Sequence, residues 1–119
     1  MTANNDYQLL AVPITDGKLC MHFGHCNHFA LFEVDKENKR IIGRQDIDPP
    51  PHAPGLLPPW LAKRGVQTVI AGGIGQRAQQ LFSQHGVEVI AGASAETPEK
   101  LIEAYFAGNL KLGDNCCDH

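Results

Sequence analysis

Two short segments in the second half of the chain share one pattern, and this repetition limits the folds that the chain can adopt. Residues 64–73 read RGVQTVIAGG and residues 85–93 read HGVEVIAGA, and a helix-like pattern precedes each of them, over 56–65 and 76–86. Two successive helix–strand units of this kind predict neighbouring parallel strands joined by a right-handed crossover. Because the VIAG runs are apolar throughout, these strands must be buried on both faces, which requires helices on both sides of the sheet.

The first half of the chain predicts strands of a different kind. Residues 8–14, 29–35 and 40–47 read as strands, and the polar turn 36–39 makes the last two an antiparallel hairpin. Residues 48–55 contain four prolines and are predicted to be a loop, whereas 97–108 have the start and stop signals of a third helix. The result is an α/β fold with a mixed sheet flanked by helices.

The length of 119 residues corresponds to one domain. We place this single domain at residues 1–109, and we predict that 110–119, which have no periodicity, form a flexible tail containing Cys and His.

Charge and composition argue against several partners. The formal net charge is −3 and no run of Lys or Arg is present, so the sequence gives no reason to expect nucleic acid as a partner. No apolar run approaches the length of a membrane span, and the start MTANNDYQ lacks the features of a secretory signal. We therefore expect a cytoplasmic protein without a membrane partner. In that compartment thiols stay reduced, so four cysteines indicate metal or redox work rather than disulfides.

Residues 20–29, CMHFGHCNHF, hold two of the four cysteines and three of the six histidines. Thiolate and imidazole are the ligands that zinc, copper(I) and iron–sulfur units prefer. The candidate metal ligands here are Cys20, His22, His25 and Cys26. Their spacing matches no standard zinc motif, so it indicates a metal without naming one. The alternative is that some of them are buried packing residues, since cysteine often behaves as a small hydrophobic residue, and that His28 is only a strand residue.

The end of the chain is a second group of soft ligands. Cys116, Cys117 and His119 lie in the predicted tail, and an arm of this kind can fold over a bound species and lend a thiolate. The alternative is a loose terminus whose thiols have no role.

Residues 71–78, AGGIGQRA, fit the pattern G-x-G-x-x-G/A at the start of a helix. The context of a dinucleotide site is missing, because the next strand ends in Ala-Gly-Ala without an acidic residue. The general expectation that remains is an anion at the helix N-terminus, with Arg77 adding positive charge. The alternative is that the glycines only permit tight packing of strand and helix.

Two remaining observations concern chemistry. His52 lies in the proline-rich loop, where it either reaches toward the Cys/His cluster or is an exposed loop residue. No set of acid, base and nucleophile can be named, so we expect a protein without enzymatic activity.

Taken in order, these segments resemble a known family. The chain has a first strand, the segment Met21-His22-Phe23-Gly24-His25, an aromatic-rich second strand, a loop with His52, and a strand that leads through Gly72-Gly73-Ile74-Gly75 into a helix. This order resembles the dinitrogenase iron–molybdenum cofactor family (NifX, NafY and the C-terminal domain of NifB), which includes small proteins of anaerobes such as the orange protein of sulfate reducers. The resemblance covers about residues 8–108.

The resemblance implies an RNase H-like fold with a mixed sheet of about five strands. It also implies binding of a molybdenum- or iron-containing sulfide cluster without turnover. By position, the cofactor-binding residues would be His22, Phe23, Gly24, His25, His52, Gly72, Gly73, Ile74, Gly75 and Arg77. The four thiols do not carry over from the family pattern.

Three hypotheses follow. The first is a carrier or assembly protein for a metal–sulfur cluster of molybdenum with copper or iron, whose partners are the cluster and a protein that receives it or a P-loop ATPase. The second is a mononuclear zinc or copper(I) protein that uses the Cys/His loop and the tail. The third is a module that regulates a partner protein and has lost its cofactor.

Overall fold

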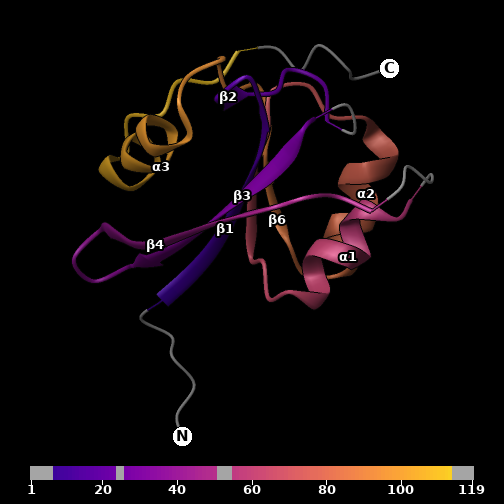
Figure 1. Ribbon diagram of the computed structural model, residues 1–119, viewed down its shortest axis with the longest axis horizontal. Helices are drawn as coiled ribbons and strands as arrows, with labels where there is room; N and C mark the ends of the chain where they lie inside the picture. Colours follow the sequence, from indigo (N-terminus) through magenta and orange to yellow (C-terminus); the bar gives the residue numbers. More distant parts are fainter. Residues whose placement is uncertain (1–6, 24–25, 51–54, 114–119) are drawn as a thin grey trace, which may run out of the picture.

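The computed structural model describes residues 7–23, 26–50 and 55–113 (Figure 1). They form one mixed sheet in the order β4-β3-β1-β5-β6, with the short β2 paired to the end of β1. β1, β3 and β4 are antiparallel neighbours, whereas β5 is parallel to β1 and β6 is parallel to β5. The strands are β1 (Tyr7–Thr15), β2 (Lys18–Leu19), β3 (His28–Asp35), β4 (Arg40–Ile47), β5 (Thr68–Ile70) and β6 (Glu88–Ile90). This is the mixed, RNase H-like sheet that the sequence and the resemblance predicted.

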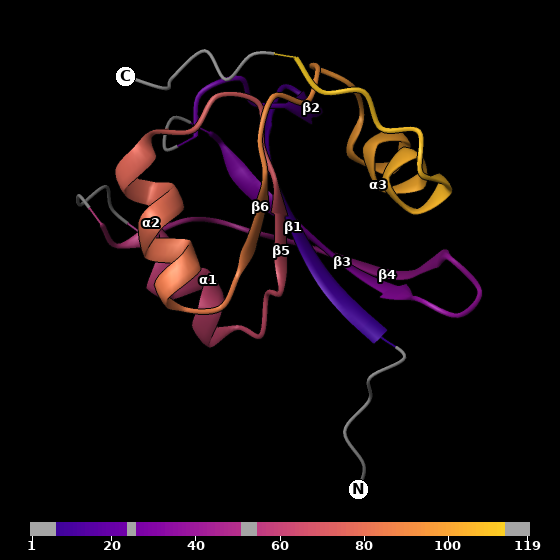
Figure 2. The same cartoon turned by 180° about the vertical axis from the view of Figure 1, so that it is seen from behind.

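Helices cover both faces of the sheet. α1 (Leu57–Lys63) and α2 (Gln76–Gln84) lie on one face, and α3 (Pro98–Ala107) lies on the other (Figures 1 and 2). Because successive strand residues point to opposite faces, β1 contributes to both cores: Leu10 and Val12 pack on the α3 side, and Ala11 packs on the side of α1 and α2. The predicted flanking of the sheet by helices is confirmed.

One strand was missed. β2 forms a tight hairpin with the end of β1, in which Thr15 pairs with Lys18 and Ile14 with Leu19. Asp16 and Gly17 both have positive φ, 55° and 80°, as a two-residue hairpin turn requires. A two-residue strand leaves no periodic pattern, which is why the sequence did not show it.

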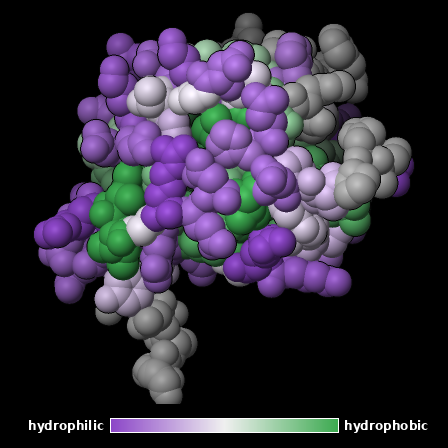
Figure 3. Space-filling view, viewed as in Figure 1, coloured by the Kyte–Doolittle hydropathy of each residue, from purple (hydrophilic) through white to green (hydrophobic). Residues whose placement is uncertain are grey.

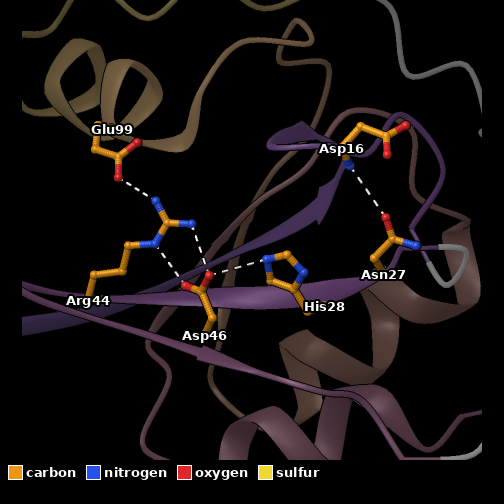
Figure 4. A network of polar contacts seen from close by, with 6 residues as sticks. All are labelled: Asp16, Asn27, His28, Arg44, Asp46 and Glu99. Atoms are coloured by element: carbon orange, nitrogen blue, oxygen red, sulfur yellow. Dashed lines mark hydrogen bonds and ion pairs between the residues drawn. The ribbon is translucent and has the colours of Figure 1, made fainter.

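Polar contacts fasten the antiparallel edge of the sheet to α3 (Figure 4). The guanidinium of Arg44 in β4 donates to both carboxylate oxygens of Asp46, at 2.8 and 3.1 Å, and to Glu99 of α3. The hydrogen bonds from Arg44 hold the pKa of Asp46 below its ordinary value. His28 Nε2 lies 3.3 Å from Asp46 Oδ2. His28 is therefore a strand residue with a structural contact, which was the alternative to a role as a metal ligand.

Residues 110–113, the start of the predicted tail, contact the domain. Leu110 is half-buried against the core on the α3 side, and Leu112 forms an antiparallel bridge with Ala93. The N–H of Gly113 donates to the carbonyl of Gly92 at 2.7 Å. Residues 114–119 lie outside the described residues, so their predicted flexibility and the boundary at 109 stay predictions.

The surface is mainly polar on the side shown in Figure 3, with separate hydrophobic areas. Across residues 7–23, 26–50 and 55–113, no helix combines the length and the apolar character that crossing a bilayer requires.

Candidate functional site

The candidate site lies at the sheet edge where the parallel strands β1, β5 and β6 end. Here the segment after β2 runs beside the turn between β5 and α2, and His22 forms a parallel bridge with Gly73. The N–H of Gly73 donates to the carbonyl of Met21 at 2.7 Å, and the N–H of Phe23 donates to the carbonyl of Gly73 at 2.8 Å. Two motifs that lie about fifty residues apart in the sequence are therefore neighbours, at the position where α/β sheets commonly bind ligands.

The pairing continues across four segments, which we call the edge ladder: residues 21–23, 71–73, 91–93 and 112–113. The N–H of Gly92 donates to the carbonyl of Gly72 at 2.8 Å. The last segment joins the edge ladder because the N–H of Gly113 donates to the carbonyl of Gly92. The edge ladder extends the sheet beyond the ends of β5 and β6. Its middle segments, 71–73 and 91–93, belong to the apolar runs that predicted strands, whereas the addition of 21–23 and 112–113 was not predicted.

The glycines of the 72–75 turn have two different roles. A Cβ atom at Gly72 would lie 3.1 Å from Met21 Cα and Sδ, so Gly72 permits the close approach of two backbones. Gly75 is the N-cap residue of α2, its added Cβ would meet nothing within 4 Å, and among the described residues no side chain caps the helix there. The first turn of α2 is thus open to an anion, and Arg77 is exposed in that turn.

Several predicted site residues are mainly structural. Ile74 has 0% exposure in the core, so only its backbone can line a site. Phe23 is half-buried, and its ring lies 5.8 Å from that of Phe29 and 5.5 Å from that of Phe82. These contacts anchor the residue that follows His22, whose own side chain is exposed.

The two described cysteines of the cluster have different surroundings. Cys20 is 7% exposed, and its thiol donates to the carbonyl of His22 at 3.2 Å. Cys26 is half-buried and packs against the core on the side of α1 and α2. The end of the segment is tied back to the β1–β2 turn, because the N–H of Asp16 donates to the side-chain oxygen of Asn27 at 3.4 Å (Figure 4).

An open groove of about 500 Å³ adjoins the site. Its lining brings together two predicted ligands, Cys20 and His22, but not Cys26 or the 72–75 turn. The lining residues are Thr15, Asp16, Lys18, Leu19, Cys20, Met21, His22 and Ala95.

Six predicted site residues lie outside the described residues: Gly24, His25, His52, Cys116, Cys117 and His119. Within the described part of the chain, no three His, Cys, Asp or Glu side chains gather closely enough to hold a metal ion. A complete protein ligand set therefore cannot be built from the described residues.

The sheet order, the flanking helices and the loops gathered at the ends of the parallel strands define a small α/β domain with a candidate binding site at one edge. The family described as dinitrogenase iron–molybdenum cofactor matches residues 8–108 of this sequence, so the chain belongs to that family.

Three known proteins are similar to this chain in sequence or in fold. An uncharacterized protein of Methanocaldococcus jannaschii is 30% identical over 109 residues, which are 86% of this chain and 88% of that protein. The crystal structure of the protein PH0822 superposes with a TM-score of 0.81 at 25% identity and covers 88% of this chain and 94% of that one. The apo form of the orange protein from Desulfovibrio gigas shares the fold, with a TM-score of 0.71 at 21% identity over 91% of this chain and 94% of that one.

Proposed function

We propose that this chain carries a metal–sulfur cluster of molybdenum with iron or copper, or takes part in its assembly, and does not transform it. The observation that carries the proposal is the backbone pairing of His22 with Gly73, because it places the Cys/His segment beside the turn that leads into the start of α2. Membership of the iron–molybdenum cofactor family and the shared fold of the orange protein support a cofactor-binding role.

The chemistry of such a cargo agrees with the groups at this edge. A molybdenum–sulfide cluster is a bulky anion, and its sulfides accept hydrogen bonds without a covalent link to protein. His22 offers an N–H donor, the first turn of α2 offers backbone N–H groups, and Arg77 and Lys18 add positive charge nearby. A site of donors suits this cargo better than a bare cation, for which the described residues provide no group of three ligands.

The partners and location belong to the same proposal. A carrier has to pass its cargo on, so we propose transfer to a cluster-receiving protein or interaction with a P-loop ATPase, in the cytoplasm. The exposed Met21, 38% accessible at the rim of the site, provides an apolar contact for a receiving protein.

Substitution of His22 by alanine should reduce retention of a molybdenum cluster about tenfold, because one charge-assisted donor to the anion is lost. The measurement is molybdenum content per chain after incubation with thiomolybdate and copper(I) or iron(II), followed by desalting. His85→Ala is the matched control, since His85 is an exposed histidine at the far end of α2. Equal retention by both variants and the unchanged protein would remove His22 from the site.

The second proposal is a single zinc or copper(I) ion held by the Cys/His segment and the tail. The observation in its favour is that Cys20 and His22 line one groove. The two proposals differ in colour, because zinc and copper(I) are closed-shell ions without visible bands, whereas metal–sulfide clusters absorb visible light.

A further inference from the structure

β4 is an edge strand of the sheet, and among the described residues no strand pairs with its outer side. The backbone N–H and C=O groups along such an edge can pair with a further strand. The first half of β4 is irregular, because a bulge opposite Glu33 and Val34 leaves Ile42 out of the register with β3. Residues 43–47, which we call the pairing strip, follow in regular register with β3.

The side chains of the pairing strip differ between the two faces of the sheet. Gln45 and Ile47 lie on the face of α1 and α2, because their partners in β3 belong to the core on that side. Gly43 shares this face, and a Cβ atom there would meet no other atom closer than 3.9 Å. Arg44 and Asp46 lie on the face of α3 (Figure 4). The pairing strip therefore has one uncharged face and one face with a positive and a negative charge.

The pairing strip complements itself when two copies pair antiparallel about a two-fold axis through Gln45. Arg44 of each copy then lies opposite Asp46 of the other copy, and opposite charges directly across a strand pair stabilise the pairing. On the other face, Ile47 of each copy lies opposite Gly43 of the other copy. Gly43 lines a hollow of about 430 Å³ together with Leu31, so there is room for the side chain of the second copy.

The charges also select this register over its neighbours. A two-fold axis places residues of the same face opposite each other, so the register changes in steps of two residues. One step brings Arg44 opposite Arg44, and the step in the other direction brings Asp46 opposite Asp46; like charges in these positions are destabilising. The two hydrogen bonds between Arg44 and Asp46 hold both groups in place, and their side chains are 34% and 44% exposed.

We propose that two copies of this chain associate through β4, with residues 43–47 paired to themselves in this register and one sheet continuing through both copies. The interface is small, so we expect a dissociation constant of about 10–100 µM. The two-fold axis reverses the strand direction, so the candidate sites of the two copies lie at opposite edges of the joint sheet. The inference rests on the edge of β4 and does not depend on the proposed function.

Sedimentation equilibrium of the reduced full-length chain, from about 10 µM to about 1 mM, tests this inference. The mass should rise with concentration from the 13.0 kDa of one chain toward twice that value. Arg44→Asp and Asp46→Arg each place like charges opposite each other, so each variant alone should associate about tenfold more weakly or less. A mixture of the two variants restores opposite charges at both positions, and it should associate about as tightly as the unchanged protein.

Gln45→Lys provides the test if circular dichroism shows that either charge-reversal variant is not folded. Gln45 is exposed, and lysine there would face lysine across the two-fold axis, which should weaken association about fivefold. The matched control is Gln84→Lys, the same change at an exposed residue of α2, which should leave the association unchanged.

Four results would overturn the inference. They are the mass of a single chain up to about 1 mM, full association of both charge-reversal variants alone, a mixture of the folded variants that associates no better than either one, or equal effects of Gln45→Lys and Gln84→Lys. Each of them leaves the carrier role standing, because molybdenum retention is measured separately on the same proteins.

Discussion

Alanine at position 92 should lower the free energy of unfolding by about 2–3 kcal/mol and detach residues 112–113 from the edge ladder. Gly92 has φ +89°, and a Cβ atom there would lie 2.2 Å from the carbonyl oxygen of Gly113. The left-handed conformation costs a non-glycine residue about 1–2 kcal/mol, and the contact with a backbone oxygen cannot be relieved by rotating a side chain. The segment around Gly113 must therefore move away.

Urea denaturation measures the loss of stability, and hydrogen exchange at the Gly113 amide measures the detachment. Gly86→Ala is the matched control, because Gly86 also has positive φ, +75°, but a Cβ atom there meets nothing within 4 Å. The control should lose only the conformational part, about 1 kcal/mol. If the two variants lost the same stability and kept the same protection at Gly113, the close approach at Gly92 would be refuted.

Phe82→Ala should cost about 3–5 kcal/mol, the usual range for a fully buried phenylalanine. Phe82 has 0% exposure, and its ring meets the ring of Phe23 edge to face at 5.5 Å. The resulting cavity lies beneath the segment that presents His22, so the bond from the Phe23 amide to Gly73 should open more often. We expect faster hydrogen exchange at the Phe23 amide together with the lower midpoint in urea.

Phe106→Ala is the comparison for this prediction. Phe106 is half-buried on the other face of the sheet, where its ring contacts that of Tyr105 at 4.9 Å. Its loss should cost less, about 1–2 kcal/mol of unfolding free energy. Hydrogen exchange at the Phe23 amide should then rise only as much as global unfolding does. If exchange at the Phe23 amide in Phe82→Ala also rose only as much as global unfolding, the aromatic contact would not support the site.

The fold was largely predictable because its main elements leave local patterns. The apolar runs of β1, β5 and β6, the hairpin around residues 36–39, and the cap signals of α3 are each visible within about ten residues. What could not be predicted depends on pairing between distant segments: β2 has two residues, and the edge ladder uses glycines that any loop can contain. β5 and β6 are shorter than the apolar runs that predicted them, since residues 71–73 and 91–93 pair in the edge ladder instead.

The candidate site was predictable in part. Ligand chemistry selected Cys20 and His22, and the structure places both in one groove. The neighbourhood of His22 and Gly73 followed only from the family resemblance, because nothing in the spacing of two motifs reveals their contact in space. Sequence could not separate Ile74, whose side chain is in the core, from its neighbours in the same turn. It also could not show that His28 contacts Asp46, which depends on the register of β3 and β4.

The most direct test of the carrier role is elemental analysis by mass spectrometry for Mo, Fe, Cu and Zn. The protein is purified without oxygen or incubated with thiomolybdate and copper(I) or iron(II), and its visible spectrum is recorded on the same sample. The carrier role predicts molybdenum with iron or copper and a visible band. Zinc or copper alone, at about one ion per chain and without colour even after incubation with thiomolybdate, would contradict it.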